Sequence, residues 1–331
     1  MHSRCVFALA LAGCGDAGSG ATDAATNADA AAPCTPAPGW ADAPPLIRGA
    51  AQETATVAVD GKIYVLGGFD DALAVLDTVQ IFDPEMCVWS AGPALPRAVH
   101  HANAAVVNGT IYITGALETL GFTAVGYVWR WTPATESTWT ELAPMPAGTE
   151  RGSAVAGAIG TTIYLAGGLR GDPVALVSAY ETSTATWDTS LPSLPAPRDH
   201  GCGGVVGDTL FITGGRAGAI ASTTGSVLAY TPGGAWETRA PMPTARGGTA
   251  CGVIDDRIYV VGGEGNDAVA SGVFAESEAY VATEDRWEVL ADMTVPRHGM
   301  GAAATGRALY VPGGATRQGF GAVATHQVFT P

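Results

Sequence analysis

The strongest constraint on the fold of this chain is a short segment that recurs six times. The copies begin at residues 63, 111, 163, 210, 258 and 309, and they read IYVLGG, IYITGA, IYLAGG, LFITGG, IYVVGG and LYVPGG. The first copy alone could start a phosphate-binding loop, but it lacks the third glycine and the helix that a dinucleotide fingerprint requires. A ligand loop is rarely needed six times, whereas a structural turn is. We therefore interpret the glycines as turns.

The repeat has a constant internal organisation. Its turn glycines are Gly67, Gly115, Gly167, Gly214, Gly262 and Gly313. An aromatic residue stands three positions before each of them, and a later strand in each unit also ends in an aromatic residue. In the first five units a tryptophan follows that strand six to eight residues later. Each unit thus has room for about four short strands, which is one blade of a β-propeller.

The sixth unit is incomplete, because the chain ends at Pro331 without a tryptophan after Phe329. Trp40, however, lies 27 residues before Gly67, and this matches the spacing from tryptophan to glycine in the other units. We therefore predict an all-β, six-bladed propeller whose ring is closed by an N-terminal strand that completes the last blade. Such closure would leave no open sheet edge around the ring.

The double glycine, the aromatic residue before it and the spaced tryptophan resemble the Kelch repeat. The similarity covers residues 38–331, and only the second blade departs from it, with Gly115-Ala116 in place of two glycines. The resemblance implies a Kelch propeller, a fold used by adaptor and binding modules and by a few enzymes. No serine elbow, HExxH motif or Walker loop is present, so the sequence assigns no catalytic residue.

The N-terminus reads MHSRCVFALALAGCGD and resembles a bacterial lipoprotein signal, with cleavage before Cys14. We expect a signal peptide over residues 1–13, a flexible Ala/Gly/Ser/Thr/Pro tether over 14–37 and the propeller over 38–331. An ordinary short signal peptide or a frayed apolar N-terminus is the alternative. This interpretation predicts a monomer in the bacterial cell envelope, anchored only through an N-terminal lipid. The net charge of −15 argues against nucleic acid as a partner.

The cysteines outside the leader suggest one disulfide. Cys34 precedes the predicted strand of Trp40, Cys87 precedes Trp89 by two residues, and the predicted ring places these strands on neighbouring blades. We therefore predict a Cys34–Cys87 bond, with two free thiols as the alternative. Cys202 and Cys251 fall on inner strands and are interpreted as small core residues.

The histidines occupy related positions in alternate blades. His100 and His298 stand equally far before the turn glycine of their own blade, and His101 and His200 stand one residue closer to it. Three imidazoles around a channel could hold a metal ion, but polar residues facing a water-filled channel explain the pattern equally. A six-bladed channel can also be too wide for them to converge. The sequence therefore assigns no metal ligand and no cofactor.

Arginines recur at the predicted start of the inner strand. Sixteen residues before the turn glycine stand Arg151, Arg198, Arg246 and Arg297, and just past the glycines stand Arg170, Arg216 and Arg317. Arg48 and Arg97 take slightly displaced positions in the first two blades. In eukaryotic Kelch adaptors, which this chain resembles in position only, arginines there line a pocket for acidic peptides. Hydrogen bonds to turn carbonyls are the alternative role.

We therefore expect a binding module that holds an acidic protein segment or an anionic glycan at an arginine-lined mouth, with His200 and His298 in the same site. Forked guanidinium donors suit carboxylates and phosphates. A carbohydrate-active enzyme on acidic sugars, similar to sialic acid epimerases, is the first alternative. A purely structural component of an envelope complex is the second.

Overall fold

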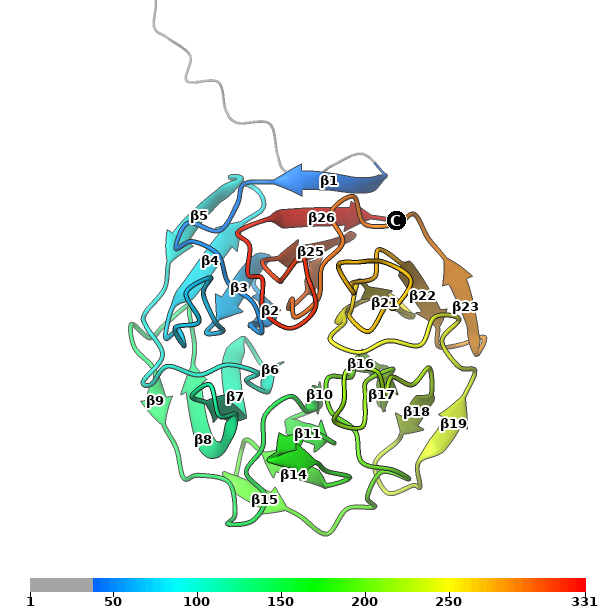
Figure 1. The fold of residues 1–331 in the computed structure, drawn as a ribbon. Coiled ribbons are helices and arrows are strands. Elements are labelled where there is room, and N and C mark those ends of the chain that lie inside the picture. Colours follow the sequence, from blue (N-terminus) through cyan, green and yellow to red (C-terminus); the bar gives the residue numbers. More distant parts are fainter. Residues whose placement is uncertain (1–37) are drawn as a thin grey trace, which may run out of the picture. The chain divides into compact units, whose positions relative to one another are not determined.

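The computed structural model describes residues 38–331, in which each repeat forms one four-stranded antiparallel sheet. The six sheets surround a central axis as the blades of a propeller (Figure 1). The predicted fold class is confirmed. Within the described residues no helix has the length and apolar character needed to cross a bilayer.

In blades 1 to 5 the strands run from the axis outward in chain order. Blade 1 contains β2 (Ala55–Val59), β3 (Lys62–Leu66), β4 (Val79–Asp83) and β5 (Val88–Ala91). Blade 2 contains β6 (Ala104–Val107), β7 (Thr110–Glu118), β8 (Thr123–Trp131) and β9 (Thr140–Glu141). Blade 3 contains β10 (Val155–Ile159), β11 (Thr162–Ala166), β14 (Val177–Glu181) and β15 (Thr186–Asp188), with a small hairpin of β12 (Leu169–Arg170) and β13 (Asp172–Pro173).

The second half of the ring repeats this order. Blade 4 contains β16 (Cys202–Val206), β17 (Thr209–Thr213), β18 (Val227–Tyr230) and β19 (Glu237–Arg239). Blade 5 contains β20 (Ala250–Ile254), β21 (Arg257–Val261), β22 (Ser277–Val281) and β23 (Arg286–Val289). Blade 6 contains β24 (Ala303–Thr305), β25 (Ala308–Pro312), β26 (His326–Thr330) and, outermost, β1 (Gly39–Ala43).

Blade 6 joins the two ends of the described chain. Strand β1 pairs antiparallel with β26, with Trp40 opposite Phe329, and the two lie side by side at the rim (Figure 1). The Trp40 indole Nε1–H donates to the Ala291 carbonyl oxygen at 2.9 Å. Trp287 makes the equivalent bond to Ala240, one blade earlier, also at 2.9 Å. Trp40 therefore links blade 6 to blade 5 in the same way that Trp287 links blade 5 to blade 4.

The burial of the strands follows from the stacking of blades. The second strand of each blade is mostly apolar, and Ile63 to Leu66 of β3 are all buried, because neighbouring blades cover both faces of the sheet. The inner strand β2 alternates between buried and half-buried residues. One side of each inner strand packs against a blade, and the other side faces the axis. The hydrophobic core therefore lies between the blades.

The double glycines form the turns predicted from the sequence. Gly67 and Gly68 have φ values of +60° and +105°, a conformation that glycine tolerates best. A Cβ at Gly67 would collide with the Val99 carbonyl oxygen of the next blade. Gly68 instead donates its N–H to that oxygen at 2.9 Å. The turn is thus also a contact between blades, which explains why it recurs.

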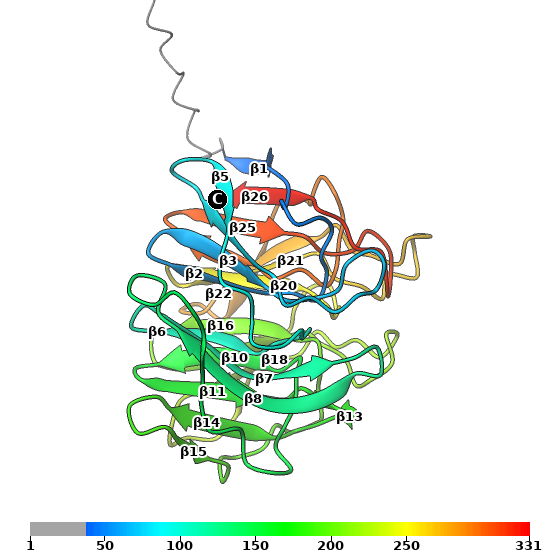
Figure 2. The same cartoon turned by 90° about the vertical axis from the view of Figure 1, so that its left-hand side faces the viewer.

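Blade 2 lacks this turn. Ala116 takes the second position, and β7 and β8 continue pairing beyond a register shift between Thr114 and Ala116. The connection therefore becomes a long regular hairpin that ends at residues 119–122. Its tip lies on the face of the ring that carries the double-glycine turns and the connections leading into the inner strands. We call this face the turn face; in Figure 2 it lies on the right.

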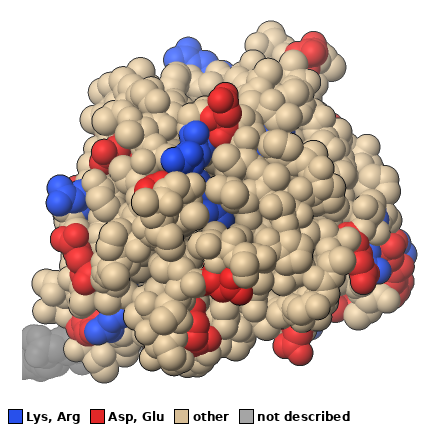
Figure 3. All heavy atoms as spheres, turned by 90° about the horizontal axis from the view of Figure 1, so that it is seen from below, with Lys and Arg blue, Asp and Glu red and all other residues tan. Residues whose placement is uncertain are grey.

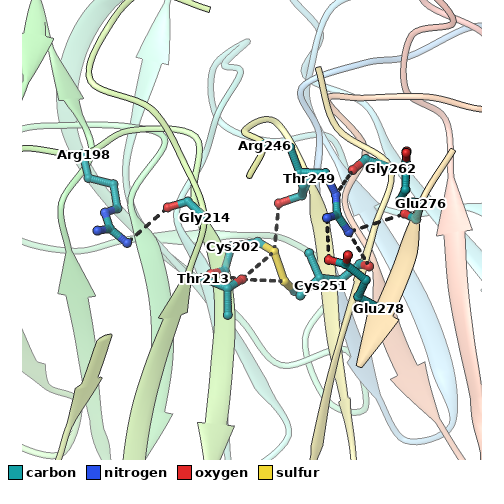
Figure 4. Close-up of a disulfide and its surroundings, with 11 residues drawn as sticks. Arg198, Cys202, Thr213, Gly214, Arg246, Thr249, Cys251, Gly262, Glu276 and Glu278 are labelled. Carbon is teal, nitrogen blue, oxygen red and sulfur yellow. Dashed lines mark hydrogen bonds and ion pairs between the residues drawn. A yellow bond between two sulfur atoms is a disulfide. The ribbon is translucent and has the colours of Figure 1, made fainter. Parts of the chain in front are cut away.

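The structure corrects one cysteine assignment. Cys202 on β16 and Cys251 on β20 form a disulfide between blades 4 and 5, with their Cα atoms 5.6 Å apart (Figure 4). They were expected to be small core residues, but the inner strands of neighbouring blades bring their side chains together beside the channel. Cys87 is also disulfide-bonded. Cys34 lies outside the described residues, so its pairing with Cys87 stays a prediction.

Candidate functional site

A ring of six residues surrounds the axis at the turn face. Its members stand fourteen positions before the turn glycine of each blade: Glu53, His101, Ser153, His200, Gly248 and Gly299. All six line one cavity of about 110 Å³. All six also have positive φ, between +50° and +64°. Only two of them are glycines, so four side chains project from backbone that favours glycine.

Hydrogen bonds connect this ring from blade to blade. The His101 N–H donates to the Glu53 carbonyl at 3.0 Å, and the Ser153 N–H donates to the His101 carbonyl at 2.9 Å. The His200 N–H donates instead to the Ser153 hydroxyl oxygen at 3.1 Å. The N–H groups of Gly248, Gly299 and Glu53 complete the circle, and each donates to the backbone carbonyl of the preceding member of the ring. The side chains at this position are therefore held on a rigid frame.

Three of the side chains meet inside the cavity. His101 Nε2 lies 2.9 Å from His200 Nε2 and 3.1 Å from Glu53 Oε2. One donor atom from each of these residues lies within 4.8 Å of the other two. Both imidazoles are buried, and the Glu53 side chain is 12% exposed. Burial tends to raise the pKa of Glu53, but the attraction of His101, His200 and His298 lowers it overall.

The hydrogen-bond pattern fixes the tautomer of His101. His100 Nε2 lies 3.0 Å from the Thr119 carbonyl oxygen, which only accepts, so Nε2 carries the hydrogen. Burial lowers the pKa of His100 to about 3, with His101 acting in the same direction, so the ring is neutral. His100 Nδ1 is then the acceptor in its 2.5 Å contact with His101 Nδ1. His101 Nδ1 is therefore the donor in this contact, and His101 Nε2 faces the cavity.

His200 is oriented by a carboxylate. Its Nδ1–H donates to Asp199 Oδ1, which leaves a lone pair on Nε2. Arg216 donates from Nη2 to this nitrogen at 3.0 Å, and it also forms ion pairs with Asp199 and Glu264. Burial lowers the pKa of His200, while the bond to Asp199 raises it and the charge of Arg216 lowers it further.

His298 lies beside this cluster but does not join it. Its Nε2–H donates to the Arg317 carbonyl oxygen at 2.9 Å. Its Nδ1 is buried, has no hydrogen-bond partner and lies 3.5 Å from Glu264 Oε2 and 3.8 Å from Glu53 Oε1. The predicted pairing of histidines by position therefore brings His101 and His200 together and leaves His100 and His298 outside the cluster.

The cavity continues into the central channel. A further cavity of about 240 Å³ is lined by three consecutive residues from each blade, such as Thr54 to Thr56 and Gly201 to Gly203. Most of these residues are small, and they include the disulfide of Cys202 and Cys251. The cluster at the turn face is therefore reached from the channel.

The four aligned arginines do not line the mouth. Arg151, Arg246 and Arg297 are fully buried, and Arg198 is nearly so. Arg151 donates from Nε to the Gly167 carbonyl at 2.8 Å, and Arg246 donates to Gly262 in the same way. Figure 4 shows the guanidinium of Arg246 turned toward Gly262 and Glu278, and that of Arg198 turned toward Gly214. The expectation of free cations fails here because the double-glycine turns offer carbonyl acceptors inside each blade.

The arginines after the turns take different positions. Arg216 is held by its two ion pairs, and Arg216 and Arg198 line a cavity of about 340 Å³ on blade 4. Arg170 and Arg317 are exposed on the turn face. Figure 3 views the ring from its edge, where acidic and basic side chains lie near one another among a larger number of uncharged ones.

Glu53 is the member of the cluster that sequence reasoning missed. It has the same distance to its turn glycine as His101 and His200, so the signal was present in the alignment of the repeats. Comparing only histidines with histidines hid it. Asp199 and Glu264 were also missed, because each can be recognised only by its position in its blade and belongs to no sequence motif.

The closed ring of four-stranded blades, linked by double-glycine turns and indole bonds, defines a Kelch-type propeller. The Kelch motif profile matches residues 52–96 and 245–294. Kelch-like protein terF of Aspergillus terreus is 36% identical over 319 residues, which cover 90% of this chain and 69% of that protein. The chain therefore belongs to the Kelch-like protein family, whose members are generally protein-interaction modules.

Human relatives match less of their own length. Kelch-like protein 23 is 25% identical over 256 residues, which cover 76% of this chain and 43% of that protein. Kelch-like protein 33 is 35% identical over 106 residues, which cover 32% of this chain and 19% of that protein. The chain thus spans less than half of either human protein.

These relatives overturn the expected location. A lipid-anchored protein of the bacterial cell envelope was predicted, but the Kelch-like proteins that match are fungal and animal. That prediction is wrong. The signal peptide over 1–13, the tether over 14–37 and lipidation at Cys14 lie outside the described residues.

Proposed function

We propose that the protein binds a segment of another protein on its turn face, with apolar contacts at the centre and arginines at the rim. The observation that carries the proposal is the placement of exposed apolar side chains. Seven large apolar residues are exposed in the described part of the chain, and four of them lie on connections of the turn face: Ile47, Leu120, Val269 and Phe320. We call these four the apolar patch.

The connections that carry the apolar patch touch one another. Leu46 and Ala51 donate their N–H groups to the carbonyls of Ala324 and Val323, so the segment of Ile47 lies along that of Phe320. The Gln318 N–H donates to the Ser271 carbonyl, which joins the segment of Val269. The patch therefore spans neighbouring blades, as a binding surface for an extended segment would require.

Phe320 also reaches the segment of Leu120 through a row of rings. The Phe69 ring lies 5.8 Å from that of Phe320 and 6.1 Å from that of Phe122. Phe69 itself is fully buried, so it supports the surface from beneath. The hairpin of blade 2 is thus packed against the segment that carries Phe320.

Exposed arginines stand beside the apolar residues. Arg48 follows Ile47 directly, and the Arg317 Nε–H donates to the Phe320 carbonyl at 2.6 Å. A guanidinium next to an apolar anchor favours a partner that alternates apolar side chains with carboxylates. The proposed ligand is therefore an acidic protein segment, held by Arg48 and Arg317 in place of the buried arginines.

The test is selection of a random peptide library on the full chain, followed by affinity measurement of the enriched peptides. We expect enrichment of Asp and Glu beside apolar residues. The variant L120E/F320E should lose at least about tenfold in affinity, because two apolar contacts are replaced by like charges. The matched control V289E/M86E changes two exposed apolar residues off the turn face and should bind normally. Equal loss in both variants, or enrichment without acidic residues, contradicts the proposal.

A further inference from the structure

We propose that Glu53, His101 and His200 form a binding site for one divalent first-row transition metal ion, through Glu53 Oε2, His101 Nε2 and His200 Nε2. The site goes beyond the proposed function, because it lies inside the ring and does not depend on a protein partner. Two imidazoles and one carboxylate are a donor set that suits Zn²⁺ and Fe²⁺.

The geometry of the three atoms fits such an ion. Metal–nitrogen and metal–oxygen bonds of about 2.0–2.2 Å place tetrahedral ligand atoms roughly 3.3–3.6 Å from one another. The separations of 2.9 Å and 3.1 Å that involve His101 Nε2 need only small outward shifts, and the third separation, between His200 and Glu53, is at most 4.8 Å. The backbone circle described above holds all three Cα atoms, so the site is formed before an ion arrives.

The three ligand atoms are free to face an ion. His101 Nε2, His200 Nε2 and one carboxylate oxygen of Glu53 face the same cavity, while the second nitrogen of each imidazole is already held by His100 or Asp199. Ligand atoms gathered from three residues repel one another less when a positive charge lies between them. The Arg216 N–H already reaches His200 Nε2, but among residues 38–331 no group outside the cluster donates to His101 Nε2. An ion at the centre satisfies all three.

The surrounding residues match the outer sphere of a metal site. Metal-bound histidines usually donate their second N–H to a carboxylate or to another acceptor, and Asp199 and His100 take these places. Arg216 would give up its bond to His200 and keep its ion pairs with Asp199 and Glu264. Three carboxylates against one guanidinium leave two negative charges near the cavity, which a dication balances.

A second observation points to the same place. His298 is fully buried, and within residues 38–331 its Nδ1 has no hydrogen-bond partner, although it lies 3.5 Å from Glu264 Oε2 and 3.8 Å from Glu53 Oε1. An unpartnered polar atom in a buried position is uncommon and indicates a missing partner. This atom lies next to one of the three proposed ligands, Glu53. With three protein ligands, the ion would keep an open position toward the channel for a water or a ligand oxygen.

The test uses the full chain without a histidine tag, stripped of metal and titrated with Zn²⁺, with Co²⁺ as a coloured probe, and anaerobically with Fe²⁺. We expect one ion per chain and, with Co²⁺, the visible absorption of a site of low coordination number. The variant H101G/H200G removes two ligands while placing glycine where blades 5 and 6 already have it. Its affinity should fall roughly 100-fold or more, since outer-sphere changes alone cost 10–100-fold.

The variant H326Q is the matched control. His326 is a buried histidine of blade 6 that contacts the Pro44 carbonyl and is no member of the cluster. It should bind the metal as the natural sequence does. Comparison of Zn²⁺ with Fe²⁺ distinguishes the two ions that the donor set accepts. Absence of binding to both ions, or equal affinity of H101G/H200G and the natural chain, overturns the proposal.

Discussion

His101 Nε2 lies 2.9 Å from His200 Nε2, although 99 residues separate them in the chain and their blades are not adjacent in the ring. The contact spans the mouth of the channel and passes over blade 3, which presents only Ser153 at this level. It is possible because both residues adopt φ of +50°, which turns their side chains inward. The width of a six-bladed channel therefore does not keep the imidazoles apart.

The first prediction concerns this backbone conformation. A left-handed φ costs a residue with a Cβ about 1–2 kcal/mol relative to glycine. The free energy of unfolding of H101G should therefore be about 1 kcal/mol higher than that of H101A. The free energy of unfolding of H200G should be higher than that of H200A by a similar amount. Chemical denaturation of the four variants without metal measures these differences. An alanine variant as stable as its glycine counterpart would show that the ring imposes no such strain.

The second prediction concerns the buried arginines. Arg246 donates to the Gly262 and Val260 carbonyls and forms an ion pair with Glu278, both side chains being buried. R246M leaves Glu278 unpaired in the interior and should cost about 3–5 kcal/mol of unfolding free energy. The exposed control R317M should change it by less than about 0.5 kcal/mol. Similar values for both variants would argue that Arg246 has no structural role.

The arginines also show where sequence reasoning reaches its limit. Repeat alignment places Arg151, Arg198, Arg246 and Arg297 correctly at one level of the ring, because the turn glycines fix the register of every blade. It does not reveal whether a side chain points out of the blade or folds back onto its own turn. That choice depends on carbonyl acceptors such as those of Gly167 and Leu165. These acceptors become visible only in three dimensions.

The cluster at the mouth was partly predictable, because the turn glycines fix the position of each residue within its blade. The shared position of His101 and His200 was seen, while Glu53 at the same position was not compared with them. The pairing of Cys202 with Cys251 was missed because they stand one residue apart in the repeat. Neighbouring blades are rotated relative to one another. Two residues on them can therefore touch even though they stand at different distances from their turn glycines.

The third prediction concerns the closure of the ring. Trp40 pairs opposite Phe329, with ring centroids 5.2 Å apart, and its indole binds the Ala291 carbonyl. Because burial of Trp40 is incomplete, W40A should cost about 2–4 kcal/mol, slightly less than truncation of a fully buried tryptophan. V289A, on the outer strand of blade 5, serves as the exposed control. No loss of stability in W40A would indicate that β1 does not hold blade 6 in solution.

The fourth prediction concerns the disulfides. Cys202 and Cys251 are 49 residues apart, so their bond should stabilise the fold by about 4 kcal/mol on the chain-entropy account. Peptide mapping without reductant should recover them as one linked pair, and C202A/C251A should unfold at lower denaturant concentration. The same map tests the predicted pairing of Cys34 with Cys87. A linked peptide joining Cys87 to any other cysteine would contradict that pairing.

The last prediction is a dependence of stability on pH that comes from His326. This residue is buried on β26, its Nδ1–H donates to the Pro44 carbonyl at 3.1 Å, and its Nε2 has no partner. Burial lowers the pKa of His326 to about 3, the bond to Pro44 opposes this, and the charge of Arg297 adds to it. In the unfolded chain the pKa of histidine is about 6.5.

Between these two values the unfolded state binds more protons than the folded state, so stability must fall as pH decreases from about 6.5 toward 3. At pH 5 the loss from this residue should be about 2 kcal/mol relative to neutral pH. H326Q keeps a side-chain donor but has no group that titrates in this range. Unfolding free energies of the natural chain and H326Q, measured from pH 7.5 to pH 5, should therefore diverge by about that amount, the natural chain losing more. Parallel curves would mean that His326 is not held neutral by its burial beneath the outermost strand.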